Sequence, residues 1–83
     1  MGGNGMVGVK DVLEVVNDFE PFEPAGVSTG LVAWELHSLE TAIERLVEQA
    51  VQTGLLEQAG VDDRSGQALW RLTEQGRETL AAT

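Results

Sequence analysis

Cysteine is absent from this sequence of 83 residues, tyrosine is absent as well, and histidine occurs once, at His37. The lack of cysteine excludes disulfides, thiolate metal sites and a cysteine nucleophile. A single histidine leaves little for general-base chemistry or for metal binding. We therefore expect a protein that is not an enzyme and that uses no cofactor.

Basic residues are scarce, since five Lys and Arg face fourteen Asp and Glu and give a formal net charge of −9. No apolar run approaches the roughly 18 residues that a membrane helix needs. The start of the chain carries neither the basic nor the apolar segment of a secretion signal. The composition therefore predicts a small, acidic, cytoplasmic binding module with no membrane segment.

Residues 1–8 hold four of the ten glycines and no charged residue. We expect them to form a flexible tail ahead of a single domain over residues 9–83. Gly3–Gly8 spells G-x-G-x-x-G, but a dinucleotide site needs this motif between a strand and a helix. No strand is predicted before it, so we interpret the match as chance.

Three helices are predicted from apolar spacing and from helix-capping residues. The first helix spans Val9–Phe19. The second spans Gly30–His37, with Ser28 or Thr29 as its cap. The third has Ser38 as its cap and runs to about Thr53. The apolar stripe of the third helix comprises Leu39, Ile43, Leu46, Val47 and Ala50. The turn between the second and third helices is only a residue or two long.

After Gly54 the apolar period changes from that of a helix to the alternation of a strand. Leu55–Ala59 and Ala68–Leu72 predict a β-hairpin with its loop centred on Asp62–Gly66, and Thr73 then caps a last helix. The predicted core comprises Val12, Leu13, Val16, Val32, Leu36, Ile43, Leu46, Val47, Leu55, Trp70 and Leu72.

The second and third helices fit a helix-turn-helix, with Ala33 as the small residue where they cross. His37 stands where such turns usually have glycine. This departure implies either a different turn conformation or a histidine with positive φ.

The stretch Leu46–Leu80 resembles the winged-helix half of bacterial and archaeal regulators of the MarR and PadR type. The matching pieces are QTGLLEQ (Gln52–Gln58), DDR (Asp62–Arg64) and LTEQGRETL (Leu72–Leu80). The resemblance covers roughly residues 27–80. It implies an α+β winged helix-turn-helix fold, with three helices, a two-stranded wing and a C-terminal helix, and it implies transcriptional regulation by binding double-stranded DNA.

In such regulators the third helix lies in the major groove and the wing reaches the minor groove or the backbone. The resemblance places five candidate DNA contacts on these two elements: Thr41, Arg45, Gln49, Arg64 and Ser65. The oligomeric state stays open.

The third helix also carries Glu40, Glu44 and Glu48 at spacing i, i+4, i+8, which aligns three carboxylates in one acidic stripe. Such a stripe opposes DNA, whose affinity comes largely from basic side chains. Two explanations remain open. One is the salt-rich cytoplasm of a halophilic archaeon, and the other is a winged helix that binds a basic protein partner.

Trp34 belongs to the second explanation. Core packing is the commoner role of a tryptophan, but an exposed Trp34 would mark a protein interface. The stripe and Trp34 together define the alternative function, a protein-interaction module.

Two further matches have simpler explanations. Gly26–Gly30 spells G-x-S-x-G, but the nucleophile elbow needs a parallel sheet, and helix capping by Ser28 or Thr29 accounts for these residues. His37 lies near Glu35 and Glu40, but zinc sites need more nitrogen or sulfur ligands, so we expect no metal.

The halophile explanation predicts that the domain loses its fold at low salt, because the net charge of −9 is then unscreened. The measurement is thermal unfolding by circular dichroism in about 20 mM and about 2 M KCl, a span that covers weak to nearly complete screening. Equal stability in the two salts would contradict the explanation.

Overall fold

The computed structural model describes residues 7–82. The elements are α1 (Val9–Phe19), β1 (Val27–Ser28), α2 (Thr29–Glu35), α3 (Glu40–Gln52), β2 (Leu56–Val61), β3 (Ala68–Leu72) and α4 (Glu74–Ala81). The strands form one antiparallel sheet in the order β1–β3–β2. Residues 1–6 of the expected tail lie outside the described residues, as does most of the Gly3–Gly8 match. No helix within residues 7–82 has the length and apolar character to cross a bilayer.

Two predicted helix starts, those of α1 and α4, are confirmed, and α2 begins at Thr29, one residue before the predicted Gly30. α1 has the predicted bounds, and the Gly8 N–H at its start donates to the Asp11 carboxylate at 2.8 Å. The Ser28 hydroxyl accepts from the Leu31 N–H at 3.1 Å and caps α2. The Thr73 hydroxyl accepts from the Gly76 N–H at 3.0 Å and caps α4. Each cap satisfies a backbone donor that the first turn leaves without a helical partner.

The predicted start of α3 is wrong. Leu39, not Ser38, holds the N-cap position and makes no side-chain cap bond, and Leu39 is 77 % exposed instead of joining the apolar stripe. The Ser38 hydroxyl instead donates to the Leu36 carbonyl at 3.2 Å. The turn is also longer than predicted, because α2 ends at Glu35 and residues 36–39 are needed to reverse the chain.

β1 was not predicted, because a strand of two residues shows no alternation. Val27 pairs with Trp70 and Ser28 pairs with Leu69. β2 extends two residues beyond the predicted Ala59, and its register shifts between Gln58 and Gly60. This bulge breaks the alternation that a sequence pattern would need.

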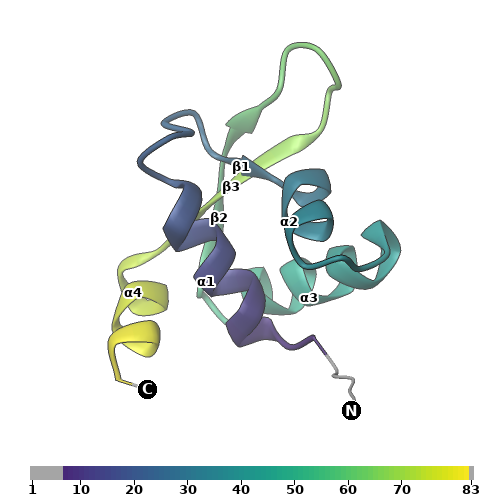
Figure 1. Cartoon of the computed structure of the whole chain (residues 1–83). Coiled ribbons are helices and arrows are strands. Elements are labelled where there is room, and N and C mark those ends of the chain that lie inside the picture. The colour runs from purple at the N-terminus through teal and green to yellow at the C-terminus, as the bar shows by residue number, and fades with distance from the viewer. Residues whose placement is uncertain (1–6, 83) are drawn as a thin grey trace.

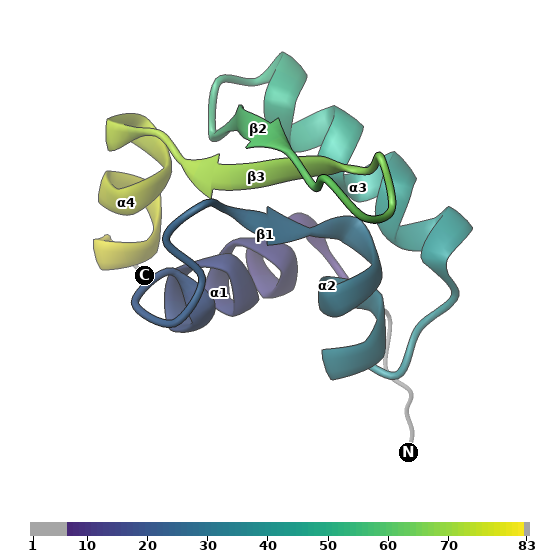
Figure 2. The ribbon, with the colours of Figure 1, turned by 90° about the horizontal axis from the view of Figure 1, so that it is seen from above.

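The core lies around α1, which packs against α2, α3, β3 and α4 (Figure 2). Of the predicted core, seven residues are buried: Val12, Leu13, Val16, Val32, Ile43, Val47 and Leu72. The other four, Leu36, Leu46, Leu55 and Trp70, are half-buried and pack against them. Val15, Val27 and Leu56 are also buried, and the prediction missed them.

The hairpin of β2 and β3 extends beyond the helices, and its loop forms one tip of the molecule (Figure 1). α2 and α3 lie on one side of α1, and α4 lies on the other. The Glu20 carboxylate fastens this second side, since it accepts from the Leu72 N–H at 3.0 Å and pairs with Arg77 at 2.8 Å. The sheet and α4 are thereby both joined to the end of α1.

α4 approaches the start of β2 so closely that it requires glycine at position 76. A Cβ at Gly76 would collide with the Leu55 carbonyl oxygen, which already accepts from the Thr73 N–H at 3.1 Å. At Gly60 a Cβ would meet nothing within 4 Å.

We expect Gly76→Ala to lower the free energy of unfolding by about 1–3 kcal/mol, the usual cost of overpacking. The backbone of Leu55 cannot move aside without losing its bond to Thr73. Gly60→Ala is the matched control and should change the free energy by less than about 0.5 kcal/mol. Urea unfolding of the two variants measures both values, and equal values for the two would contradict the role of Gly76.

Candidate functional site

The turn between α2 and α3 sets the angle of the two helices. His37 has a φ of 53°, so the second of the two options that the sequence left open is confirmed. This conformation brings the Ser38 N–H back to the Ala33 carbonyl at 2.9 Å. Ala33 is 5 % exposed, as expected of the small residue where the helices cross. The turn thus holds α3 with one face inward and the other in solvent.

The inward face of α3 comprises Ile43, Val47 and Ala50, all buried. With 3.6 residues per turn, Thr41 and Arg45 lie opposite this face. Both are exposed, as is Gln49, which lies on a flank of the helix. The acidic stripe of Glu40, Glu44 and Glu48 is exposed too. The sequence therefore placed all six of these side chains correctly at the surface.

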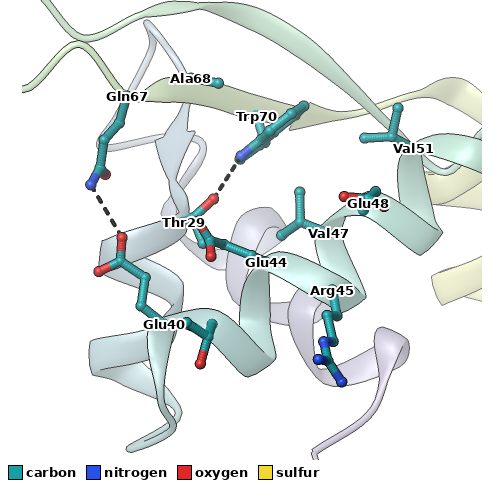
Figure 3. Close-up of a pocket in the computed structure, with 11 residues that line it drawn as sticks. Thr29, Glu40, Glu44, Arg45, Val47, Glu48, Val51, Gln67, Ala68 and Trp70 are labelled. Carbon is teal, nitrogen blue, oxygen red and sulfur yellow. Dashed lines mark hydrogen bonds between the residues drawn. The ribbon is translucent and has the colours of Figure 1, made fainter.

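A groove of about 690 Å³ runs between α3 and the start of β3 (Figure 3). It is lined by Thr29, Glu40, Thr41, Glu44, Arg45, Val47, Glu48, Val51, Gln67, Ala68 and Trp70. Gln49 does not line it. In Figure 3 the Arg45 side chain points away from the Trp70 ring, toward the outside of the groove.

Two hydrogen bonds connect the walls of the groove. Gln67 Nε2 donates to Glu40 Oε1 at 3.2 Å, and Trp70 Nε1 donates to Thr29 Oγ1 at 2.9 Å. The partners are 27 and 41 residues apart in the chain. No local sequence pattern could indicate them, and Gln67 and Thr29 were not predicted as site residues.

The hairpin loop is organised by Asp62. Its carboxylate accepts from the Ser65 hydroxyl at 2.9 Å and from the Arg64 N–H at 3.2 Å. The Ser65 hydroxyl in turn accepts from the Gln67 N–H at 3.2 Å. Gly66 has a φ of 75°, which favours glycine. Ser65 is thus engaged within the loop, whereas Arg64 is exposed.

The four arginines divide into two groups. Arg71 pairs with Glu57 at 2.9 Å and Arg77 pairs with Glu20 at 2.8 Å. Within residues 7–82, Arg45 and Arg64 form no ion pair. The arginines that the fold leaves unpaired are therefore the one on α3 and the one at the hairpin tip.

Trp34 lies outside the groove. It is 72 % exposed on α2, so its core role, the commoner one for tryptophan, is wrong here. Its neighbours Val32 and Ala33 are the buried residues of α2, and they leave the Trp34 side of the helix in solvent. In the described part of the chain, no three His, Cys, Asp or Glu side chains gather as metal ligands.

An angled helix pair joined by a short turn, followed by a β-hairpin and a closing helix, defines a winged-helix domain. This confirms the fold expected from the sequence, with α3 as the outward helix and the hairpin as the wing.

Solved structures of similar fold include those of MepR from S. aureus. A point mutant of MepR gives a TM-score of 0.75 at 15 % identity, covering 93 % of this chain and 55 % of MepR. A MepR–DNA complex gives a TM-score of 0.75 at 16 % identity, covering 89 % of this chain and 50 % of MepR. The chain spans about half the length of these neighbours, and identity this low establishes the fold alone. No protein-family model matches the chain, and no curated protein is significantly similar to it.

The loop bonds predict a pH dependence of the wing. The Ser65 hydroxyl, and next the Arg64 N–H, lower the pKa of Asp62 below its ordinary value of 3.8. Because the folded state has the lower pKa, ionised Asp62 stabilises the loop above pH 3.8, and this contribution is lost as the pH falls through the folded-state pKa.

We expect an NMR titration of the Asp62 carboxyl carbon to give a midpoint below 3.8, and Ser65→Ala to move that midpoint upward. Ser65→Thr keeps the hydroxyl and serves as the control. An unchanged midpoint in Ser65→Ala would show that the hydroxyl is not the main cause.

Proposed function

We propose that this chain is a non-enzymatic, DNA-binding winged-helix domain of a transcriptional regulator that acts in the cytoplasm. α3 enters the major groove of double-stranded DNA, with Thr41, Arg45 and Gln49 toward the bases and phosphates. The wing contacts the adjacent backbone or minor groove through Arg64, and Ser65 holds the loop that presents this arginine.

One observation carries the proposal: the two arginines without an ion pair in residues 7–82 lie on α3 and on the wing. In a winged helix these are the elements that meet DNA. The fold gives Arg71 and Arg77 carboxylate partners and keeps Arg45 and Arg64 available for phosphates. The similar fold of MepR, which was solved in a complex with DNA, supports DNA as the ligand.

The small number of basic residues limits the electrostatic contribution to DNA binding. Each phosphate that a cation neutralises contributes about 0.9 to the slope of log affinity against log salt. With Arg45 and Arg64 as the contacts, the slope per chain is about −2, far shallower than that of a basic DNA-binding domain. Discrimination between sequences then depends on polar contacts to base edges, for which Thr41 and Gln49 have suitable groups.

A second candidate function is a protein-interaction winged helix, and the exposed Trp34 is the observation that favours it. Exposed tryptophans are enriched at the energetic centres of protein interfaces. Trp34 does not line the groove beside α3. It lies on α2, whereas the DNA contact described above uses α3 and the wing, so that contact does not account for its exposure.

The test is an amide NMR titration with mixed-sequence duplex DNA, at low salt and at molar salt. We expect shifts on α3 and around Arg64. Arg45→Ala and Arg64→Ala should each weaken binding and reduce the salt slope by about 1, because each removes one phosphate contact.

Arg71→Ala is the control, since it changes the net charge equally at an arginine already paired with Glu57. An equal loss of DNA affinity in all three variants would show that the effect comes from overall charge and not from contacts of Arg45 and Arg64. No shifts in either salt, with the fold intact, would overturn the proposal and favour the second candidate.

A further inference from the structure

The groove beside α3 combines apolar and acidic side chains (Figure 3). The β3 wall carries Ala68 and the half-buried Trp70, and α3 adds Val51 and the buried Val47. The same helix carries the acidic stripe of Glu40, Glu44 and Glu48. Val51 is 38 % exposed, so apolar surface is open to an occupant.

The stripe has no internal counter-charge. Within residues 7–82, none of its three carboxylates forms an ion pair, and Glu40 accepts only the neutral Gln67 amide. Like charges four residues apart on a helix repel one another. Arg45 lines the same groove but points away from Trp70, toward the outside. A cationic occupant would therefore meet carboxylates that nothing in the described fold neutralises.

DNA fits this groove poorly, because its phosphates would face the stripe. A basic, extended peptide fits better on two counts. Successive carboxylates of the stripe lie about 6 Å apart along the helix, and alternate side chains of an extended peptide lie about 6.7 Å apart. The apolar residues Val51, Ala68 and Trp70 can pack against the aliphatic stems of arginine or lysine.

We propose that this groove binds an extended, basic segment of a partner protein, with basic side chains at alternate positions toward Glu40, Glu44 and Glu48. Thr41 and Arg45 line the same groove, so a bound segment covers part of α3. As a consequence that rests on the proposed function, the segment and DNA compete for the domain.

The binding test uses no DNA. A short synthetic peptide of alternating arginine and leucine is titrated into the labelled protein and followed by amide NMR. We expect shifts along α3 and at Gln67–Trp70, and none with a peptide of alternating glutamate and leucine. Absence of binding by the arginine peptide, or equal binding of both peptides, would overturn the proposal.

Charge variants distinguish binding of the peptide at the groove from attraction by the overall negative charge. We expect Glu44→Gln and Glu48→Gln each to weaken the peptide about two- to five-fold, the range for exposed ion pairs. Glu78→Gln, on α4 and outside the groove, changes the net charge equally and should leave affinity unchanged. An equal loss in Glu78→Gln would show that only long-range charge acts, and would overturn the site.

The two proposals fail separately. A protein that binds the duplex but not the arginine peptide keeps the proposed function and loses the groove. A protein that binds the peptide but not the duplex keeps the groove and loses the DNA function. Where both bind, the peptide should displace the duplex, and simultaneous binding would overturn the competition.

Discussion

The burial of α1 is the constraint on which the rest of the structure depends. This helix packs against α2, α3, β3 and α4, and its Val12 and Val16 have no exposed surface. α3 and the wing therefore take their relative position from a shared apolar support. The hydrogen bond from Gln67 to Glu40 joins them directly, but it lies at the surface, where one neutral donor contributes little. The geometry of the site is thus a product of core packing, not of contacts within the site.

Charge is the second constraint, because basic residues are few. Five basic residues must serve both the fold and any anionic ligand. The Glu20 carboxylate pairs with Arg77 and also accepts from the Leu72 N–H. Glu20 thereby joins the end of α1 to β3 and α4. Arg71 is held across the hairpin by Glu57. Three basic residues remain without an ion pair in residues 7–82: Lys10 lies on α1, and only Arg45 and Arg64 lie on α3 and the wing.

The sequence predicted what local chemistry decides. α1 follows from its apolar spacing, and the Ser28 and Thr73 caps follow from hydroxyls within three residues of their donors. The true start of α3 did not follow, because the His37 conformation, not a cap, determines the turn. β1 and the groove depend on strand pairing and on side chains 27 and 41 residues apart, which leave no periodic signal. The sequence thus located the exposed residues of α3 but not the groove beside them.

The acidic stripe and the two arginines without an ion pair in residues 7–82 face different sides of the domain, so both can bind ligands of opposite charge. Glu44 lines the groove toward the sheet, whereas Arg45 lies at its outer edge and Arg64 at the wing tip. A polyanion and a polycation can therefore approach the same helix from different sides, and each contacts the side chains of opposite sign. In the two proposals both occupants would cover α3, but only DNA would contact the wing tip, because Arg64 does not line the groove. Arg64 is consequently the residue that the proposed DNA contact uses and the proposed peptide contact does not.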